Sequence, residues 1–242
     1  MRTYLNISPK ESKGLDKPLY KNALSLKRDA ILIAEKRKSY SSASSLLILS
    51  TEECVKSILV LLHSEKYNIY RIKDARKLFS DHIIRHQIAM FVIMALKFQD
   101  VFKEGLNLSP SKLLNLKGDN FDAFLSLAED ILIQLEPLFN ETNPDIEYLQ
   151  DFNDIKNKGF YVDYRDQLVN PKTEVTIEDY SKVLKINTKV FKFNKMLRIL
   201  FHEKVENHMK KEKIVEAKKF IKEFIDDGMK LVSLEELKKK SL

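Results

Sequence analysis

Residues 43–64 read ASSLLILSTEECVKSILVLLHS, and this stretch decides the fold. It is long enough for about six turns of helix, and apart from a Glu-Glu-x-x-Lys element near its middle it is almost wholly apolar. A helix that is apolar all round must lie at the centre of its domain. The longest uncharged apolar run, Ile88–Leu96, is much shorter than the roughly 20 residues needed to span a bilayer. We therefore expect a bundle packed around residues 43–64.

The rest of the chain supplies helices of ordinary length around this centre, with few glycines or prolines to interrupt them. We predict an all-α, antiparallel helical bundle, because short connections favour antiparallel neighbours. A short β-prone segment at Gly159–Tyr164 interrupts the helices. The expected helices cover about Leu19–Lys38, Leu78–Lys103, Phe121–Phe139, Pro144–Asn157, Thr176–Lys210, Lys211–Asp227 and Leu234–Lys240. The predicted divisions are a polar N-terminal arm (1–18), the bundle (19–173) and a basic C-terminal helical extension packed on it (174–242).

Composition narrows the class of protein. The chain has 242 residues, of which 44% are hydrophobic, enough to bury a core. A single cysteine, Cys54, excludes an internal disulfide and a Cys-based zinc site. With a polar N-terminus that lacks a signal-like apolar core, this favours a soluble protein of the reducing cytoplasm. The net charge is +7, and residues 174–242 hold 17 basic and 12 acidic residues. Their interleaving favours a solvated helix over a nucleic-acid surface.

The charges inside the apolar helix are its unusual feature. Glu53 and Lys56 fall along one stripe with Leu46, Leu49 and Val60, which places them on a face of expected core residues. Glu52 precedes Lys56 by four residues, with the acid N-terminal, which favours a helical ion pair. Because unpaired buried charges are costly, we expect these groups to pair with each other or with the next helix. Such a network can lock helix register, serve a functional site, or do both.

A second polar group lies at the start of the next long helix. His82, Arg85 and His86 share one face there, and Arg76 precedes His82 by six positions. Such residues suit RNA cleavage without a metal, because a histidine can move a proton at the 2′-hydroxyl while an arginine stabilises charge on the phosphate. The spacing alone is weak evidence for RNA cleavage. It fits equally a histidine at the start of a helix that is bonded to Glu52 or Glu53. No third metal ligand and no Gly-rich phosphate loop is present at a clear spacing, so we expect no metal and no cofactor.

Three elements together resemble a known family. They are EECVK at Glu52–Lys56, FSDHIIR at Phe79–Arg85, and GFYVDY at Gly159–Tyr164. These elements are similar to the EE-x-x-K, F-x-x-H-x-x-K and L-Y-V-D elements of the AbiV-type abortive-infection proteins, a branch of the HEPN superfamily. The resemblance runs from about Ala23 to Pro171.

The resemblance implies a HEPN-like helical bundle that defends bacteria against phage by arresting growth or translation. One implied mechanism is metal-independent RNA cleavage by a HEPN-type endoribonuclease; the alternative is a non-catalytic protein that occupies an RNA or protein target. The expected partners are a second copy in a homodimer, RNA or the translation machinery, and a phage-encoded activator, with no membrane. Arg85 stands where the family usually has Lys. The implied catalytic residues are His82, Arg76, Arg85, Glu53 and Lys56, supported by Glu52, His86 and Asp163.

Overall fold

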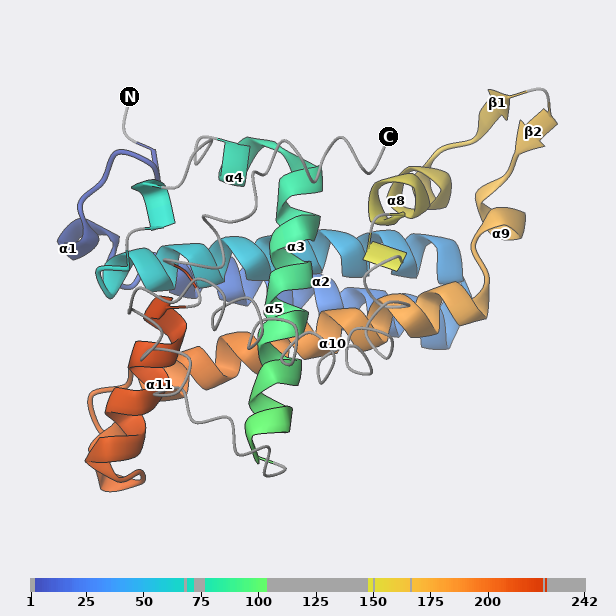
Figure 1. The fold of residues 1–242 in the computed structure, drawn as a ribbon. Coiled ribbons are helices and arrows are strands. Elements are labelled where there is room, and N and C mark those ends of the chain that lie inside the picture. The colour runs from blue at the N-terminus through green and yellow to red at the C-terminus, as the bar shows by residue number, and fades with distance from the viewer. Residues whose placement is uncertain are drawn as a thin grey trace, which may run out of the picture.

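The fold is a bundle of helices with one short hairpin at its edge (Figure 1). The computed structural model describes residues 3–67, 69–71, 77–103, 148–149, 151–165, 167–223 and 225. The helices are α1 (Pro9–Ser12), α2 (Asp16–Arg37), α3 (Tyr40–Ser64), α4 (Lys77–Ser80), α5 (His82–Lys103), α8 (Phe152–Phe160), α9 (Pro171–Glu174), α10 (Ile177–Leu200) and α11 (Lys211–Glu223), with 3-10 turns η1 (Ile69–Arg71) and η2 (Val205–Asn207). The predicted all-α fold is confirmed. The helices expected at 121–139 and 234–240 lie outside the described residues.

Helix α3 lies at the centre and packs against α2, α5, α8 and α10. Ser50 Oγ donates to the Ala23 carbonyl at 2.7 Å and Ser57 Oγ to the Asp16 carbonyl at 3.1 Å, so α2 runs antiparallel to α3. On another side of α3, the Asn187 amide of α10 donates to the Leu47 carbonyl at 3.2 Å. The prediction that residues 43–64 form the central helix is confirmed. None of the described helices is long and apolar enough to cross a membrane.

The predicted core stripe of α3 is wrong at four of its five residues, since Val60 alone is buried. Ser42, Leu46, Leu49, Glu53 and Lys56 are only partly buried, whereas most of the other residues of the helix are buried. The reason is that neighbours cover α3 on nearly every side and leave one narrow face partly open. A helix apolar all round has no periodicity from which that face can be identified.

The helix predicted at 78–103 is broken near its start. The Asp81 carboxylate accepts hydrogen bonds from the backbone N–H groups of Ile83 and Ile84 at 2.9 and 3.4 Å, which caps a new helix. The chain therefore forms α4, turns at Asp81 and begins α5 at His82. Helix α5 crosses α3 and α10 steeply instead of lying antiparallel beside α3 (Figure 1).

Helix α8 lies close against the first half of α3. Gly159 permits this approach, since a Cβ there would lie 2.2 Å from Ser45 Oγ and 2.7 Å from the Ser41 carbonyl oxygen. Ser45 Oγ also donates to the Lys156 carbonyl at 3.0 Å. After α8 the chain forms an antiparallel hairpin of β1 (Asp163–Arg165) and β2 (Gln167–Val169), in which Tyr164 pairs with Leu168. The β-prone segment thus begins later than predicted, because Gly159 and Phe160 still belong to α8.

Helix α10 shares the core with α2 and α3. Val183, Ile186, Val190 and Leu197 are buried in the same apolar cluster as residues of these two helices. Residues after 174 therefore contribute to the core, and the division of the chain into three parts stays a prediction.

Candidate functional site at the contact of helices α3, α5 and α8

The site is built around one buried carboxylate, that of Glu52 on α3, which is 3% exposed. Its Oε2 accepts from Arg85 Nε at 3.2 Å and Nη2 at 2.9 Å, and lies 2.5 Å from His82 Nδ1. Its Oε1 lies 3.1 Å from His86 Nε2 and 3.5 Å from Lys156 Nζ. Donors from α5 and α8 thus converge on a single acid of α3.

His82 is the member of this cluster that reaches solvent, with 47% of its side chain exposed. Its Nδ1 is near both Glu52 Oε2 and Arg85 Nη2, the latter at 2.8 Å. An ionised carboxylate can only accept, so the proton in the short contact belongs to Nδ1. Arg85 then directs its own N–H groups to Glu52. The Nδ1 edge of the ring is thus held against Glu52 and Arg85, and Nε2 makes no hydrogen bond to the described residues.

The electrostatics of the cluster favour an ionised Glu52 and a neutral His86. Burial alone would raise the pKa of the Glu52 carboxyl, but hydrogen bonds from His86 and Arg85 outweigh it and hold this pKa well below its usual range. Burial lowers the pKa of His86 despite its bond to Glu52. A neutral His86 donates its Nε2–H to Glu52, so the carboxylate keeps its full negative charge.

Positive charge exceeds negative charge in this cluster. Arg85 and Lys156 are both buried, at 3% and 8% exposed, and both face the single charge of Glu52. Arg85 Nη1 is buried and has no hydrogen-bond partner among the described residues. Its burial removes Arg85 from direct contact with a large substrate. Arg85 contacts both Glu52 and His82 from within the cluster.

Lys156 was missed in the sequence, although a signal was present. Phe152, Lys156 and Gly159 are spaced i, i+4 and i+7, and all three are buried. A lysine on the apolar face of a short helix is the same kind of signal that marked His82 and Arg85.

The structure places Glu53 and Lys56 away from the Glu52 cluster, and their predicted orienting role stays a prediction. These two side chains pair with each other at 2.5 Å on the partly exposed face of α3, and Glu53 also accepts from the Asn22 amide at 3.2 Å. Neighbouring side chains on a helix point about 100° apart, so Glu52 faces α5 while Glu53 faces α2. The alternative that His82 bonds to the Glu-Glu pair is confirmed, with Glu52 as the partner.

The remaining predicted site residues lie away from this cluster or cannot be placed in it. Arg76 lies outside the described residues. Asp163 is the first residue of β1, where it pairs with Val169, and its supporting role stays a prediction. Tyr161 and Tyr164, on either side of Asp163, are 66% and 73% exposed. Within the described part of the chain, no three His, Cys, Asp or Glu side chains are arranged as metal ligands.

Comparison with known proteins identifies the family. A family model described as AbiV, of the HEPN class, matches residues 11–192, well over half of the chain. The matched residues include α3, α5 and α8 and end within α10. Searches of curated proteins and of solved structures found no match. The resemblance drawn from the three sequence elements is confirmed, and the chain belongs to the HEPN AbiV family.

Proposed function

We propose that this protein acts in abortive infection by cleaving RNA without a metal, with His82 as the catalytic residue. Membership of the AbiV family indicates an anti-phage, abortive-infection role. One observation supports the mechanism: the half-exposed imidazole of His82 is bonded through Nδ1 to a buried carboxylate. That bond fixes the tautomer and leaves Nε2 as a proton acceptor that faces outward.

The chemical step in this proposal is attack of a ribose 2′-hydroxyl oxygen on the adjacent phosphorus. Nε2 of His82 takes the hydroxyl proton as the new P–O bond forms and the bond to the 5′-oxygen breaks. The imidazolium that results is stabilised by Glu52, which Arg85 holds in place. The leaving oxygen takes its proton from this imidazolium or from water. Arg76, six residues before His82, is the proposed phosphate contact.

The test is incubation of the purified protein with total bacterial RNA and with tRNA in EDTA. His82→Ala is compared with a matched control, His208→Ala, since His208 is also exposed but lies between η2 and α11. The parent and His208→Ala should cleave RNA. His82→Ala should be slower by about 100-fold or more, the usual contribution of a general base. Its melting temperature should stay close to that of the parent, because Glu52 keeps its other donors.

A second candidate function is a non-catalytic protein that blocks translation by occupying its target. The burial of Glu52, Arg85 and His86 favours it, since this network also serves to hold α3 and α5 together. In that case growth arrest survives His82→Ala, and neither parent nor variant cleaves RNA. Repeating the assay in extract from phage-infected cells separates this outcome from an enzyme that awaits a phage-encoded activator.

Two further expectations belong to this proposal and rest on the family resemblance. The protein acts as a homodimer, and it acts on RNA or on the translation machinery. Light scattering on the purified chain tests the first, and ribosome profiling during arrest tests the second.

A further inference from the structure

We propose that two copies of this chain associate through the β1–β2 hairpin, with β1 of one copy paired antiparallel to β1 of the other. The surface, here called the hairpin patch, consists of Phe160, Tyr161, Val162, Tyr164 and Leu168. The partner, a second copy, rests on the homodimer expected under the proposed function; the choice of this surface does not.

Exposed apolar residues are concentrated in this short segment. Eleven large apolar residues are exposed in the part of the chain that the structure describes, and five of them fall between residues 160 and 168. Tyr161, Val162, Tyr164 and Leu168 are each between 64% and 73% exposed. Single exposed apolar side chains are ordinary, whereas a cluster of them marks a site of interaction.

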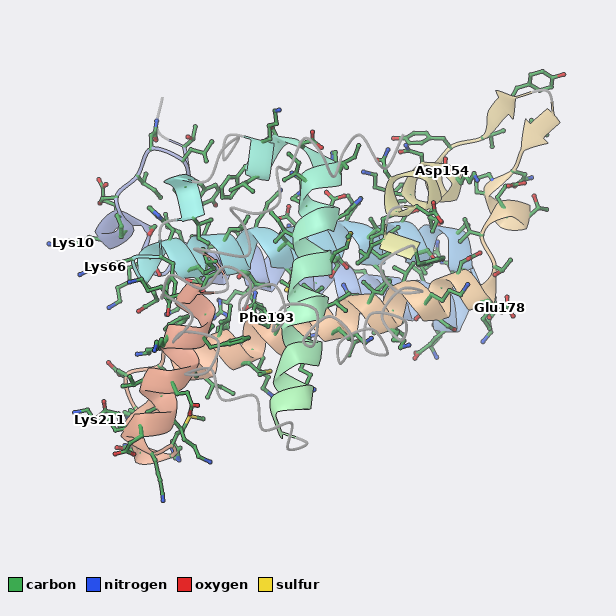
Figure 2. The ribbon with its side chains drawn as sticks, viewed as in Figure 1. Lys10, Lys66, Asp154, Glu178, Phe193 and Lys211 are labelled. Atoms are coloured by element: carbon green, nitrogen blue, oxygen red, sulfur yellow. The ribbon has the colours of Figure 1, made fainter. Side chains whose placement is uncertain are left out.

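The backbone of the hairpin also favours a partner strand. The hairpin stands at the outer edge of the molecule, beyond α8 and its residue Asp154 (Figures 1 and 2). Each strand has three residues, and the sheet that the described residues form has two strands. A two-stranded hairpin is only marginally stable in water, and the outer edge of a strand keeps backbone groups that another strand can bind. Pairing with a second hairpin would give a sheet of four strands.

The sequence of β1 is complementary to itself when two copies run antiparallel. Strand β1 reads Asp163-Tyr164-Arg165. With Tyr164 opposite the same residue of the second copy, Asp163 is opposite Arg165, and two-fold symmetry repeats this pair on the other side. Opposite charges directly across paired strands stabilise the pairing, and so do opposed aromatic residues. Strand β2, Gln167–Val169, contains no charged residue and gives no such register.

The same pairing gathers the exposed apolar residues of the two strands. Tyr164 is directly opposite Leu168 within the hairpin, and residues directly opposite one another share one face of a sheet. In the sheet of two copies the strand order is β2, β1, β1, β2. One face then carries Leu168 and Tyr164 of each copy in a single row, where neighbouring side chains cover part of one another.

Charge favours a protein partner over RNA at this surface. Residues 159–170 contain two acidic residues and one basic residue, although the chain as a whole carries a net charge of +7. RNA binding draws on basic groups that neutralise phosphates, and a segment of net negative charge opposes it. Tyrosine and phenylalanine are enriched at protein interfaces, where their rings fill the apolar centre.

The test measures the mass of the purified chain by sedimentation velocity from about 2 to about 200 µM, since so small a contact should give a dimer of micromolar affinity. Asp163→Arg and Arg165→Asp each place like charges opposite one another at both pairs, so each should weaken dimerisation by about tenfold or more. Both substitutions in one chain restore opposite charges and should restore the dimer. A mixture of the two single variants should also dimerise, because the two basic residues of the first then face the two acidic residues of the second.

A second variant, Tyr164→Ser with Leu168→Ser, removes the apolar row and should also weaken dimerisation. Its control, Leu32→Ser with Val215→Ser, changes two exposed apolar residues on α2 and α11 and should keep the dimer. Circular dichroism checks that every variant is folded.

Three results would each overturn the proposal: a parent that stays monomeric at the highest concentration, a dimer that the hairpin variants do not weaken, or a mixture of the two single variants that stays monomeric. So would hairpin variants that lose RNA binding and keep the mass of the parent. A dimer that forms as described by a chain that does not cleave RNA would leave this proposal standing and remove only the proposed enzymatic function.

Discussion

Replacing Glu52 by Gln should destabilise the protein far more than the same change at Glu53. The two acids are adjacent, but Glu52 is 3% exposed and faces a buried arginine, whereas the Glu53–Lys56 pair is about one-fifth exposed. Glu52→Gln removes the negative charge that compensates Arg85. The glutamine amide has one acceptor oxygen where the carboxylate has two, so some of the buried donors around it lose their partner. Glu53→Gln keeps an oxygen for Asn22 and loses only a partly exposed ion pair.

The geometry sets the size of the effect. At 2.9 Å between Arg85 Nη2 and Glu52 Oε2, Coulomb's law with an effective dielectric constant of about 20 gives roughly 6 kcal/mol of attraction. Part of that attraction offsets the cost of burying both charges, and removal of one partner of a buried pair typically costs about 3–5 kcal/mol. For a chain of this size that corresponds to a fall in melting temperature of about 6–20 °C. Glu53→Gln should cost about 1 kcal/mol or less.

Thermal and urea unfolding of the parent and the two variants, followed by circular dichroism, measure these differences at pH 7.5. A third variant, Glu52→Met with Arg85→Met, removes both buried charges and should recover part of the loss. The reasoning fails if Glu53→Gln is as destabilising as Glu52→Gln. It fails equally if the double variant is no more stable than Glu52→Gln, because then removing the unpaired charge of Arg85 relieves nothing.

Two further predictions concern the pH dependence of stability and the packing of α8. The stability of the protein should fall in two stages as the pH is lowered. The first stage comes from His86, whose pKa is lowered in the folded state. Below about pH 6.5, the ordinary value for a histidine, the unfolded chain gains a proton at this residue more readily than the folded chain does, which favours unfolding. Glu52, whose pKa is also lowered, contributes stability that is complete above about 4.5 and is lost below it. Urea unfolding from about pH 8 to about pH 2 checks both stages, and Glu52→Gln should remove the lower one. Gly159→Ala should push α8 away from Ser45 and cost about 1–3 kcal/mol, while the exposed neighbour Asn157→Ala should be nearly neutral by thermal unfolding.

The central helix and the general place of the site could be predicted from the sequence. An apolar stretch as long as residues 43–64 has few other ways to avoid water, so its central position follows from the hydrophobic effect alone. The cluster on α5 was also visible, because His82, Arg85 and His86 share a face that continues as apolar residues. Polar groups on such a face need partners, and the preceding helix offered the nearest acids.

Which of the two adjacent acids, Glu52 or Glu53, faces α5 could not be predicted from the sequence. Periodicity identifies a buried face only when another face is exposed, and α3 is buried on nearly all sides. The contrast between Glu52 and Glu53 depends on where α2 and α5 lie around α3, which is a property of tertiary packing. The break at Asp81 was missed for a different reason: a helix continues through an aspartate unless its side chain finds the next N–H groups, as it does here.

Helix α8, which precedes the hairpin, contributes a positive charge to the cluster that contains His82. Glu52 receives donors from two elements: His82, Arg85 and His86 come from α5, and Lys156 comes from α8. The three α5 contacts to Oε2, two from Arg85 and one from His82, fix the carboxylate whether or not α8 is in place. Lys156 adds a positive charge 3.5 Å from Oε1. Withdrawal of α8 would therefore leave the His82–Glu52 bond intact and change the electrostatic potential around it. If His82 is the base, Gly159→Ala should shift the pH dependence of RNA cleavage toward higher pH, since loss of a nearby cation favours the imidazolium. A purely structural role for α8 would lower stability and leave that pH dependence unchanged.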